Sequence, residues 1–225
     1  MNSSTPAALQ PSITSTSRGA TAMPRSLRSL CAAALAGAVL LGTAPSALAS
    51  SWDLDAGHSR VGFAVKHMTI ALVHGSFAKY AGTVTLDDAD LTRSKVHLEI
   101  DTASITTAND KRDDDLRSPL FFDVAKFPKM TFDSTRVQRR GADTLIVTGN
   151  LTLKTITRPV VLTVSGLTGE VKDPFGATRR GATAHAKISR KEFGLTWNKT
   201  LEAGGVVLGD EIAIEIDVEL KKQPS

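Results

Sequence analysis

The feature that most constrains the fold is a strict alternation of apolar and polar residues near the C-terminal end of the chain. Ile212, Ile214, Ile216, Val218 and Leu220 are each separated by one alanine or acidic residue. A period of two residues is that of a β-strand with one buried side and one solvent-facing side. Strands of this kind belong to antiparallel sheets, because strands of parallel sheets are usually buried on both sides.

The same alternation recurs after residue 58 and predicts about eight strands. Their predicted ranges are 60–67, 77–86, 96–101, 129–137, 145–153, 160–164, 182–189 and 212–220. No helical period of ten or more residues separates them, and turn signals lie between neighbours, so we expect a meander of antiparallel strands. The sequence therefore predicts an all-β protein, with a closed eight-stranded barrel favoured over a two-sheet sandwich because closure removes exposed edges.

The interior of such a barrel is either filled by side chains or open to one small ligand. The predicted inward positions combine bulky residues with a row of small ones, Ala182, Ala184, Ala186 and Gly149. Because protein interiors are close-packed, this feature alone favours a filled barrel, with an open channel as the alternative.

One stretch departs from the strand pattern and predicts a short helical or loop excursion at about residues 103–127. A run of charged residues at 110–115 is followed there by a Ser-Pro break and then by a cluster of large apolar residues. Four of the eight phenylalanines of the chain fall within the twelve residues 121–132. Long connections in all-β proteins often carry function, so we expect part of the functional site here.

The first 49 residues predict a secretory signal peptide. Arg25 and Arg28 precede an apolar run that ends in Ala47-Leu48-Ala49, and this order matches a basic region, a hydrophobic region and a cleavage site. We expect cleavage after Ala49, which leaves a single domain at residues 50–225, and Met23 is a credible true start. The run is too short and too interrupted for a membrane span.

Removal of the signal peptide changes the charge of the protein. Three of the 27 basic residues and no acidic ones lie within residues 1–49, so the remaining chain holds 24 basic and 23 acidic residues. A net charge of about +1 gives no electrostatic basis for nucleic-acid binding. The only cysteine, Cys31, is removed as well.

No local motif predicts catalysis or metal binding. The sequence holds no G-x-S-x-G, no Gly-rich phosphate loop and no H-E-x-x-H, although a catalytic triad assembled from distant positions stays open. His58, His67, His74 and His97 lack the spacing of a metal site. The acidic run at 109–115 lacks the glycine and the distal glutamate of a calcium loop. We therefore predict a binding protein without metal or cofactor.

Six blocks in order resemble the YceI-like family of bacterial polyisoprenoid-binding proteins, over about residues 51–221. The blocks are WDLDAGHSRVGFAVKHM (52–68), HGSF (74–77), DTASITT (101–107), KRDDDLRSPLFFDVAKFPKMTF (111–132), GNLTLKTITRPV (149–160) and ISRKEFGL (188–195). Two departures stand out, because Lys154-Thr155 replaces a more usual His-Gly and Leu120 replaces a polar residue. We expect neither departure to touch the ligand tunnel.

This resemblance implies an extended lipocalin-like antiparallel barrel with a long apolar tunnel. It implies a linear amphiphile as ligand, a polyisoprenoid or an isoprenoid quinone, which a periplasmic carrier or store holds without catalysis. A lipid-modifying enzyme that uses the same tunnel, and an interaction or stress module with a solid core, are the alternatives. The resemblance also implies transient contact with a membrane or a membrane protein for ligand exchange, and a homodimer stays open.

The predicted ligand-binding residues come from the inward strand positions and from the aromatic cluster. They are Phe63, Val65, His67, Phe77, Val96, Leu98, Phe121, Phe122, Phe127, Met130, Phe132, Val147, Ala184 and Ile214. Aromatic and methionine side chains adapt to irregular apolar ligands, although the five from Phe121 to Phe132 equally suit a plug at one end of the barrel. His67 is the polar exception and is predicted to hydrogen-bond the head group of a quinone or alcohol.

Overall fold

The computed structural model describes residues 49–202 and 204–224. The predicted signal peptide, apart from Ala49, lies outside the described residues. Among those described, no helix is long and apolar enough to cross a membrane.

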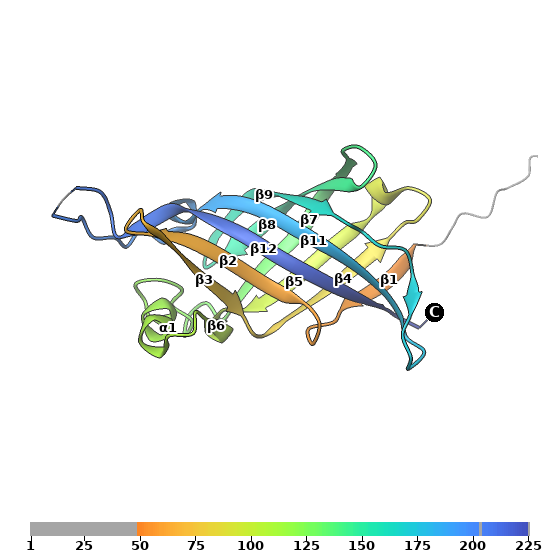
Figure 1. The fold of residues 1–225 in the computed structure, drawn as a ribbon, viewed down its shortest axis with the longest axis horizontal. Coiled ribbons are helices and arrows are strands. Elements are labelled where there is room, and N and C mark those ends of the chain that lie inside the picture. Colours follow the sequence, from red (N-terminus) through yellow and green to blue (C-terminus); the bar gives the residue numbers. More distant parts are fainter. Residues whose placement is uncertain (1–48, 203, 225) are drawn as a thin grey trace, which may run out of the picture. The chain divides into compact units, whose positions relative to one another are not determined.

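Twelve strands and one α-helix make up the described fold (Figure 1). The strands are β1 (Ser50–Leu54), β2 (Arg60–His67), β3 (Ala71–Phe77), β4 (Tyr80–Leu86), β5 (Lys95–Asp101), β6 (Ile105–Thr106), β7 (Lys129–Arg139), β8 (Thr144–Leu153), β9 (Ile156–Ser165), β10 (Val171–Lys172), β11 (Thr178–Ser189) and β12 (Leu208–Lys222). The helix α1 spans Asp110–Arg117, and three 3₁₀ turns, η1 (Leu91–Arg93), η2 (Thr102–Ser104) and η3 (Arg190–Phe193), lie between strands.

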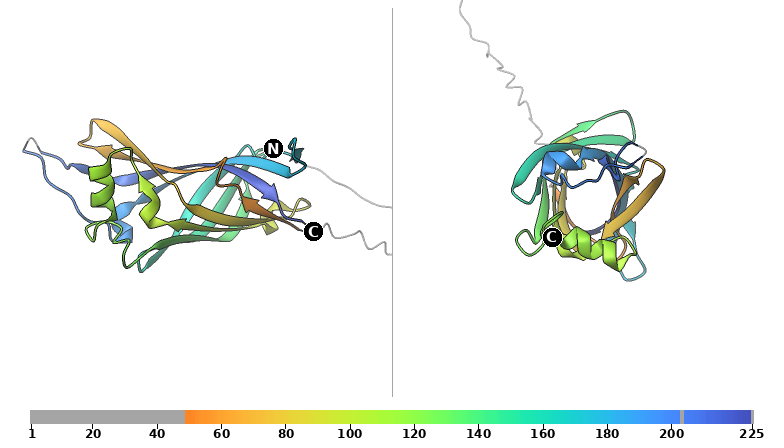
Figure 2. Two further views of the ribbon diagram at one scale, coloured as in Figure 1. Left: turned by 90° about the horizontal axis from the view of Figure 1, so that it is seen from below. Right: turned by 90° about the vertical axis from the view of Figure 1, so that its left-hand side faces the viewer.

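The strands form the predicted closed, eight-stranded antiparallel barrel. Some short strands follow one another at the same position in the barrel, so the barrel has fewer positions than the chain has strands. β1 and β2 follow each other along the same edge of β12, at Trp52↔Lys222 and Val65↔Ile212. β3 and β4 likewise pair with β2 and β1 in turn, and β6 continues β5 beside β3. The order β1/β2, β3/β4, β5/β6, β7, β8, β9, β11, β12 is a meander that closes through the β11–β12 and β12–β1/β2 pairings. Figure 2 shows the strands arranged around one axis.

The longest strand, β12, is also the one whose alternation is cleanest in the sequence. It pairs with β11 at eleven consecutive positions on one edge and with β1 and β2 on the other. At a rise of ~3.3 Å per residue, the path from Leu208 to Leu220 along β12 is about 40 Å. The inward residues of one strand therefore run along most of the barrel interior.

Inward-facing glycines make room for aromatic rings at the barrel wall. A Cβ on Gly75 would clash with the Phe63 ring, and one on Gly149 would clash with the Phe132 ring. Each ring occupies the space that a side chain at the glycine would take. The same pairing of glycine with an aromatic ring occurs in designed sheets. The small inward Gly149 thus accommodates a large neighbour, while the centre of the barrel stays open.

The predicted excursion at about 103–127 contains η2, β6, α1 and the turns that follow. Asn109 caps the helix by accepting a hydrogen bond from the Arg112 backbone N–H at 3.0 Å. The helix is short because Ser118-Pro119 follows it, and proline disfavours a helical conformation at the preceding residue. Figure 2 shows α1 at the rim of one end of the barrel, which we call the helix end.

Candidate functional site: an apolar cavity inside the barrel

The barrel encloses a cavity of about 730 Å³. Its wall is built almost wholly from aliphatic and aromatic side chains that alternate inward along the barrel strands. The inward residues of β12, at Leu208, Ile212, Ile214, Ile216, Val218 and Leu220, all line it. The close packing that a filled barrel requires is therefore absent from the centre of this one.

Thirteen of the fourteen residues predicted to bind ligand line the cavity. They are Phe63, Val65, His67, Phe77, Val96, Leu98, Phe121, Phe122, Met130, Phe132, Val147, Ala184 and Ile214. The strand periodicity placed the wall residues correctly, because one period-2 pattern fixes which side chains face inward. Their contact with a ligand stays a prediction.

Phe127 is the exception and does not line the cavity. Phe127 is half-buried, and the Lys154 ammonium lies 5.7 Å from the centroid of its ring. The same ammonium donates a 2.9 Å hydrogen bond to the Phe121 carbonyl oxygen. Phe127 thus packs against Lys154, which also contacts Phe121, but Phe127 itself is not part of the cavity wall. Sequence spacing did not reveal this, because the chain turns irregularly between α1 and β7.

Leu120 contradicts the expectation that it lies away from the tunnel. It lines the cavity, yet 61% of its surface is exposed. Leu120 therefore lies at an opening of the cavity, beside the buried pair Phe121 and Phe122.

The sequence analysis did not predict Trp197 as part of the cavity wall at the helix end. Trp197 lines the cavity and meets Phe121 with ring centroids 5.3 Å apart. β9 and β11 pair only at Thr163–Ser165 and Thr183–His185, and the buried Phe193 and Leu195 fill the core beyond that point. Trp197 lies outside any strand period, so only its size and apolar character pointed to it.

The opposite end of the cavity is closed. Trp52 is fully buried in a separate cluster with Leu86 and Leu220. Arg180 and Lys222 lie over its ring, at 5.2 and 5.5 Å from the centroid. Trp52 does not line the cavity, whereas Leu220 both lines it and packs on Trp52. We call this part of the barrel the closed end.

Most of the polar residues that line the cavity lie at the helix end, and they are His67, Thr107, Arg112, Asp115, Arg190 and Lys199. Two others, Ser94 and His97, lie around the start of β5 toward the opposite end. The His67 imidazole is half-buried and forms no hydrogen bond with any described residue. The cavity is therefore mostly apolar, and its lysine, arginine and aspartate lining residues all lie at the helix end.

A hydrogen-bond network holds α1 against the cavity wall. The buried Asp113 carboxylate accepts from the Thr107 N–H at 2.8 Å and from the Thr107 hydroxyl. Burial alone would raise the pKa of Asp113, but these hydrogen bonds outweigh it and lower the pKa. Arg112 donates from Nε to the Thr107 hydroxyl oxygen at 2.7 Å. One threonine thus fixes both an acid and a base of the helix.

Arg190 is buried beside the cavity, with 3% of its surface exposed. Its guanidinium donates to the carbonyl oxygens of Gly209, at 2.8 Å, and of Leu195. Burial lowers the pKa of Arg190. The arginine ties η3 to the start of β12 and so supports the wall of the helix end.

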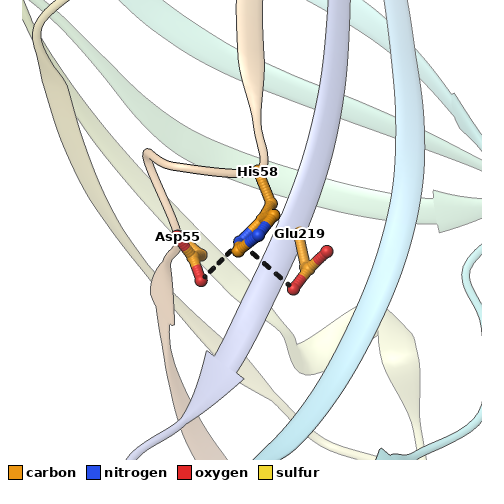
Figure 3. A group of neighbouring side chains, drawn as sticks. All are labelled: Asp55, His58 and Glu219. Carbon is orange, nitrogen blue, oxygen red and sulfur yellow. Dashed lines mark hydrogen bonds and ion pairs between the residues drawn. The ribbon is translucent and has the colours of Figure 1, made fainter. Parts of the chain in front are cut away.

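Asp55, His58 and Glu219 are the one group in the described residues with the donor types and closeness of a metal site (Figure 3). Arg179, however, already binds both carboxylates, and it also donates to Asp173 at 2.6 Å. The Arg179 guanidinium, with help from His58, lowers the pKa of Asp55 to about 2. The group is best described as an ion-pair cluster that joins β1, β11 and β12.

A histidine–aspartate pair on the outside of the barrel is the nearest approach to catalytic machinery. His97 Nδ1 lies 2.7 Å from the Asp133 carboxylate, and both side chains are at least half exposed. The neighbouring Ser134 hydroxyl oxygen accepts a hydrogen bond from the Val96 backbone N–H. Within residues 49–202 and 204–224, no serine or threonine hydroxyl is hydrogen-bonded to His97.

Comparison with known sequences identifies the family of the barrel domain. The profile of the YceI-like domain matches residues 52–220. The YceI protein of Salmonella newport is 41% identical over 161 residues, which cover 71% of this chain and 83% of that protein. The YceI protein of Salmonella arizonae has the same identity and coverage.

Solved structures show the same architecture. The YCEI protein of Campylobacter jejuni superposes with a TM-score of 0.60 at 29% identity, over 71% of this chain and 90% of that one. BcnA of Burkholderia cenocepacia gives 0.63 at 23% identity, over 74% and 98%. A polyisoprenoid binding domain from Saccharophagus degradans gives 0.55 at 18% identity, over 77% and 99%.

Proposed function

Because this chain belongs to the YceI-like family, we propose that it binds a long amphiphilic lipid, a polyisoprenoid or isoprenoid quinone, in the barrel cavity. We further propose that it carries or stores this lipid in the periplasm without catalysis, after cleavage of the predicted signal peptide. The observation that supports this best is a cavity of about 730 Å³ that is apolar along its strands and closed behind Leu220. The polyisoprenoid binding domain from Saccharophagus degradans, which shares the fold, is consistent with it.

The dimensions of the cavity suit one extended chain. Spread over the path of about 40 Å along β12, a volume of about 730 Å³ gives a mean cross-section of roughly 18 Å². Burial of a prenyl tail gains about 25 cal/mol per Å² of apolar surface, so shape and apolarity are enough for tight binding. A solid-core interaction module does not account for this cavity.

The polar side chains favour one orientation of the proposed ligand. A tail placed toward Trp52 meets mostly aliphatic and aromatic side chains, with Ser94 as a polar exception, and a head group at the helix end meets His67, Arg112 and Lys199. The reverse orientation buries a polar head among apolar groups without partners, which costs free energy. We therefore place the head group at the helix end.

Replacing Ala184 with phenylalanine tests the proposed function. Ala184 is buried and lines the cavity, whereas the next residue, His185, is exposed. The Ala184→Phe side chain fills part of the lumen, so we expect a folded protein that binds an isoprenoid quinone at least about tenfold more weakly. His185→Phe places the same phenyl side chain on the outer side of the same strand and serves as the control.

Binding is measured by native mass spectrometry and by titration of tryptophan fluorescence with a detergent-dispersed ubiquinone. Unchanged affinity in a folded Ala184→Phe variant contradicts a ligand in the cavity. Equal losses in Ala184→Phe and His185→Phe contradict it as well. Absence of binding in the wild-type protein rejects the proposed function altogether.

A further inference from the structure

Exposed aliphatic side chains gather at the helix end of the barrel. Four large ones belong to the segments around the opening of the cavity: Ile70 (80% exposed), Leu120 (61%), Leu72 (58%) and Val206 (40%). Exposed apolar side chains that form a contiguous patch on a protein surface often mark an interaction site. Neighbouring residues His67, Lys199 and Val207 line the cavity, so the cluster and the opening are continuous.

Two of these segments are held together by the backbone. The β2–β3 turn contains Met68 and Thr69 with positive φ angles of 49° and 64°, a tight turn that leaves Ile70 pointing to solvent. The Met68 N–H donates a 2.8 Å hydrogen bond to the Val207 carbonyl oxygen. Val206 in turn bridges to Thr200. The β2–β3 turn with Ile70 and the segment with Val206 are therefore joined by hydrogen bonds beside the opening of the cavity.

The charge of the hairpin that carries Ile70 and Leu72 suits an anionic surface. Residues 56–86 contain no aspartate and no glutamate. Lys66 lies directly opposite Leu72 in the β2–β3 pairing, and Lys66 and Lys199 are both exposed. Basic side chains beside exposed apolar ones are the combination that binds membranes containing anionic lipids.

We propose that the helix end docks on the surface of a phospholipid bilayer, with Ile70, Leu72 and Val206 inserted between the lipid chains. Leu120, which is exposed and also lines the cavity, lies at the border between the membrane and the cavity. An apolar tail that moves from the bilayer into the barrel then avoids exposure to water. This inference rests on the proposed function, because only an apolar ligand requires such a path.

The opposite end of the barrel provides a matched comparison. Phe175, in the turn between β10 and β11, is 95% exposed and is the most exposed large hydrophobic residue described. β11 begins at that end and reaches the helix end only at Ser189, so Phe175 lies about 40 Å from Ile70 along the strands. If exposure alone determined membrane contact, Phe175 would be the preferred anchor.

The experiment compares Ile70→Ser/Leu72→Ser with Phe175→Ser in co-sedimentation with vesicles of phosphatidylethanolamine and phosphatidylglycerol. We expect the double variant to bind vesicles at least about tenfold more weakly than wild type, and Phe175→Ser to bind like wild type. Val206→Ser, in the segment before β12, is expected to show a smaller loss of vesicle binding. Affinity for detergent-dispersed ubiquinone should stay unchanged in all three, because none of these residues lines the cavity.

The outcomes separate this inference from the proposed function. Wild-type protein that binds ubiquinone but not vesicles overturns the inference and leaves the proposed function standing, and it points to a membrane protein as the exchange partner. Equal vesicle binding by wild type and the double variant, or a larger loss in Phe175→Ser, also overturns it. Failure of wild type to bind ubiquinone rejects the proposed function.

Discussion

Each end of the barrel contains one tryptophan, and the two residues are held in different ways. At the closed end Trp52 is fully buried, packs on Leu86 and Leu220, and lies beneath two cationic side chains. At the helix end Trp197 is only partly buried, belongs to no strand and meets Phe121 across the cavity. A barrel with one fixed end and one loosely connected end can admit a ligand without losing its core.

The polar interactions differ in the same way. At the closed end, Arg179 joins carboxylates from the turn after β1, from β12 and from the turn before β11, which are distant in the sequence. At the helix end, the network that holds α1 is local, because Asp113, Thr107 and Arg112 lie within six residues of one another, although the Met68–Val207 and Lys154–Phe121 hydrogen bonds join more distant segments there. Local networks let one segment open without unfolding of the whole domain, because stability need not be uniform across a structure. We expect exchange of ligand at the helix end.

The largest expected effect comes from replacing the two tryptophans. Trp52→Ala leaves a large cavity in a closed cluster and is expected to lower the free energy of unfolding by about 3–5 kcal/mol. Trp197→Ala removes a partly exposed ring and is expected to cost about 1–2 kcal/mol. Urea denaturation of both variants measures the difference.

Ligand exchange is expected to respond in the opposite order. Trp197→Ala should speed the release of bound ubiquinone to acceptor vesicles, because one side of the helix end is then missing. Trp52→Ala should leave the rate of release nearly unchanged at temperatures where it is folded. If Trp197→Ala destabilises the protein as much as Trp52→Ala, the contrast between the two ends is wrong.

A smaller effect is expected from the ion-pair cluster near the closed end. The pKa of Asp55 falls from 3.8 to about 2 on folding, chiefly because of the Arg179 hydrogen bond. A lowered pKa in the folded state stabilises the protein above pH 4, and this stabilisation is lost as the pH falls through 2. Asp55→Asn should therefore lower the free energy of unfolding at neutral pH by about 1 kcal/mol, since the site is partly exposed to solvent.

The test compares urea denaturation midpoints of wild type and Asp55→Asn between pH 7 and pH 2. The difference should shrink as the pH falls, because protonation removes the same charge from the wild-type protein. Asp53→Asn is the control, since the Asp53 side chain hydrogen-bonds the Gln223 amide and lies outside the Arg179 cluster. A constant difference across this pH range contradicts the proposed ionic contribution of Asp55.

The sequence predicted the barrel wall better than its ends, for a physical reason. Along a strand such as β12, one period assigns every side chain to the inside or the outside, so local sequence determines which residues line the cavity. The closed end depends on long-range contacts: Trp52 meets Leu220, and Arg179 meets Asp55. No local pattern specifies which residues at such separations meet.

The irregular segments of the helix end show the same limit. Composition predicted a functional role for the cluster after α1, and Phe121 and Phe122 do line the cavity. It did not distinguish them from Phe127, which packs beneath Lys154. It also did not place Leu120 at the opening. In a segment without a period, the direction of each side chain depends on turns that only the folded chain reveals.

The smallest expected effect concerns His67 and the head group of the ligand. A neutral hydrogen bond contributes about 0.5–1.5 kcal/mol, so His67→Leu should weaken the binding of an isoprenoid quinone by roughly two- to tenfold. His67→Gln keeps a polar group and should restore most of this affinity. Binding of an isoprenoid hydrocarbon that lacks a head group should be equal in all three proteins. If His67→Leu weakens the hydrocarbon as much as the quinone, His67 acts as part of the wall, and the head group belongs elsewhere along the cavity.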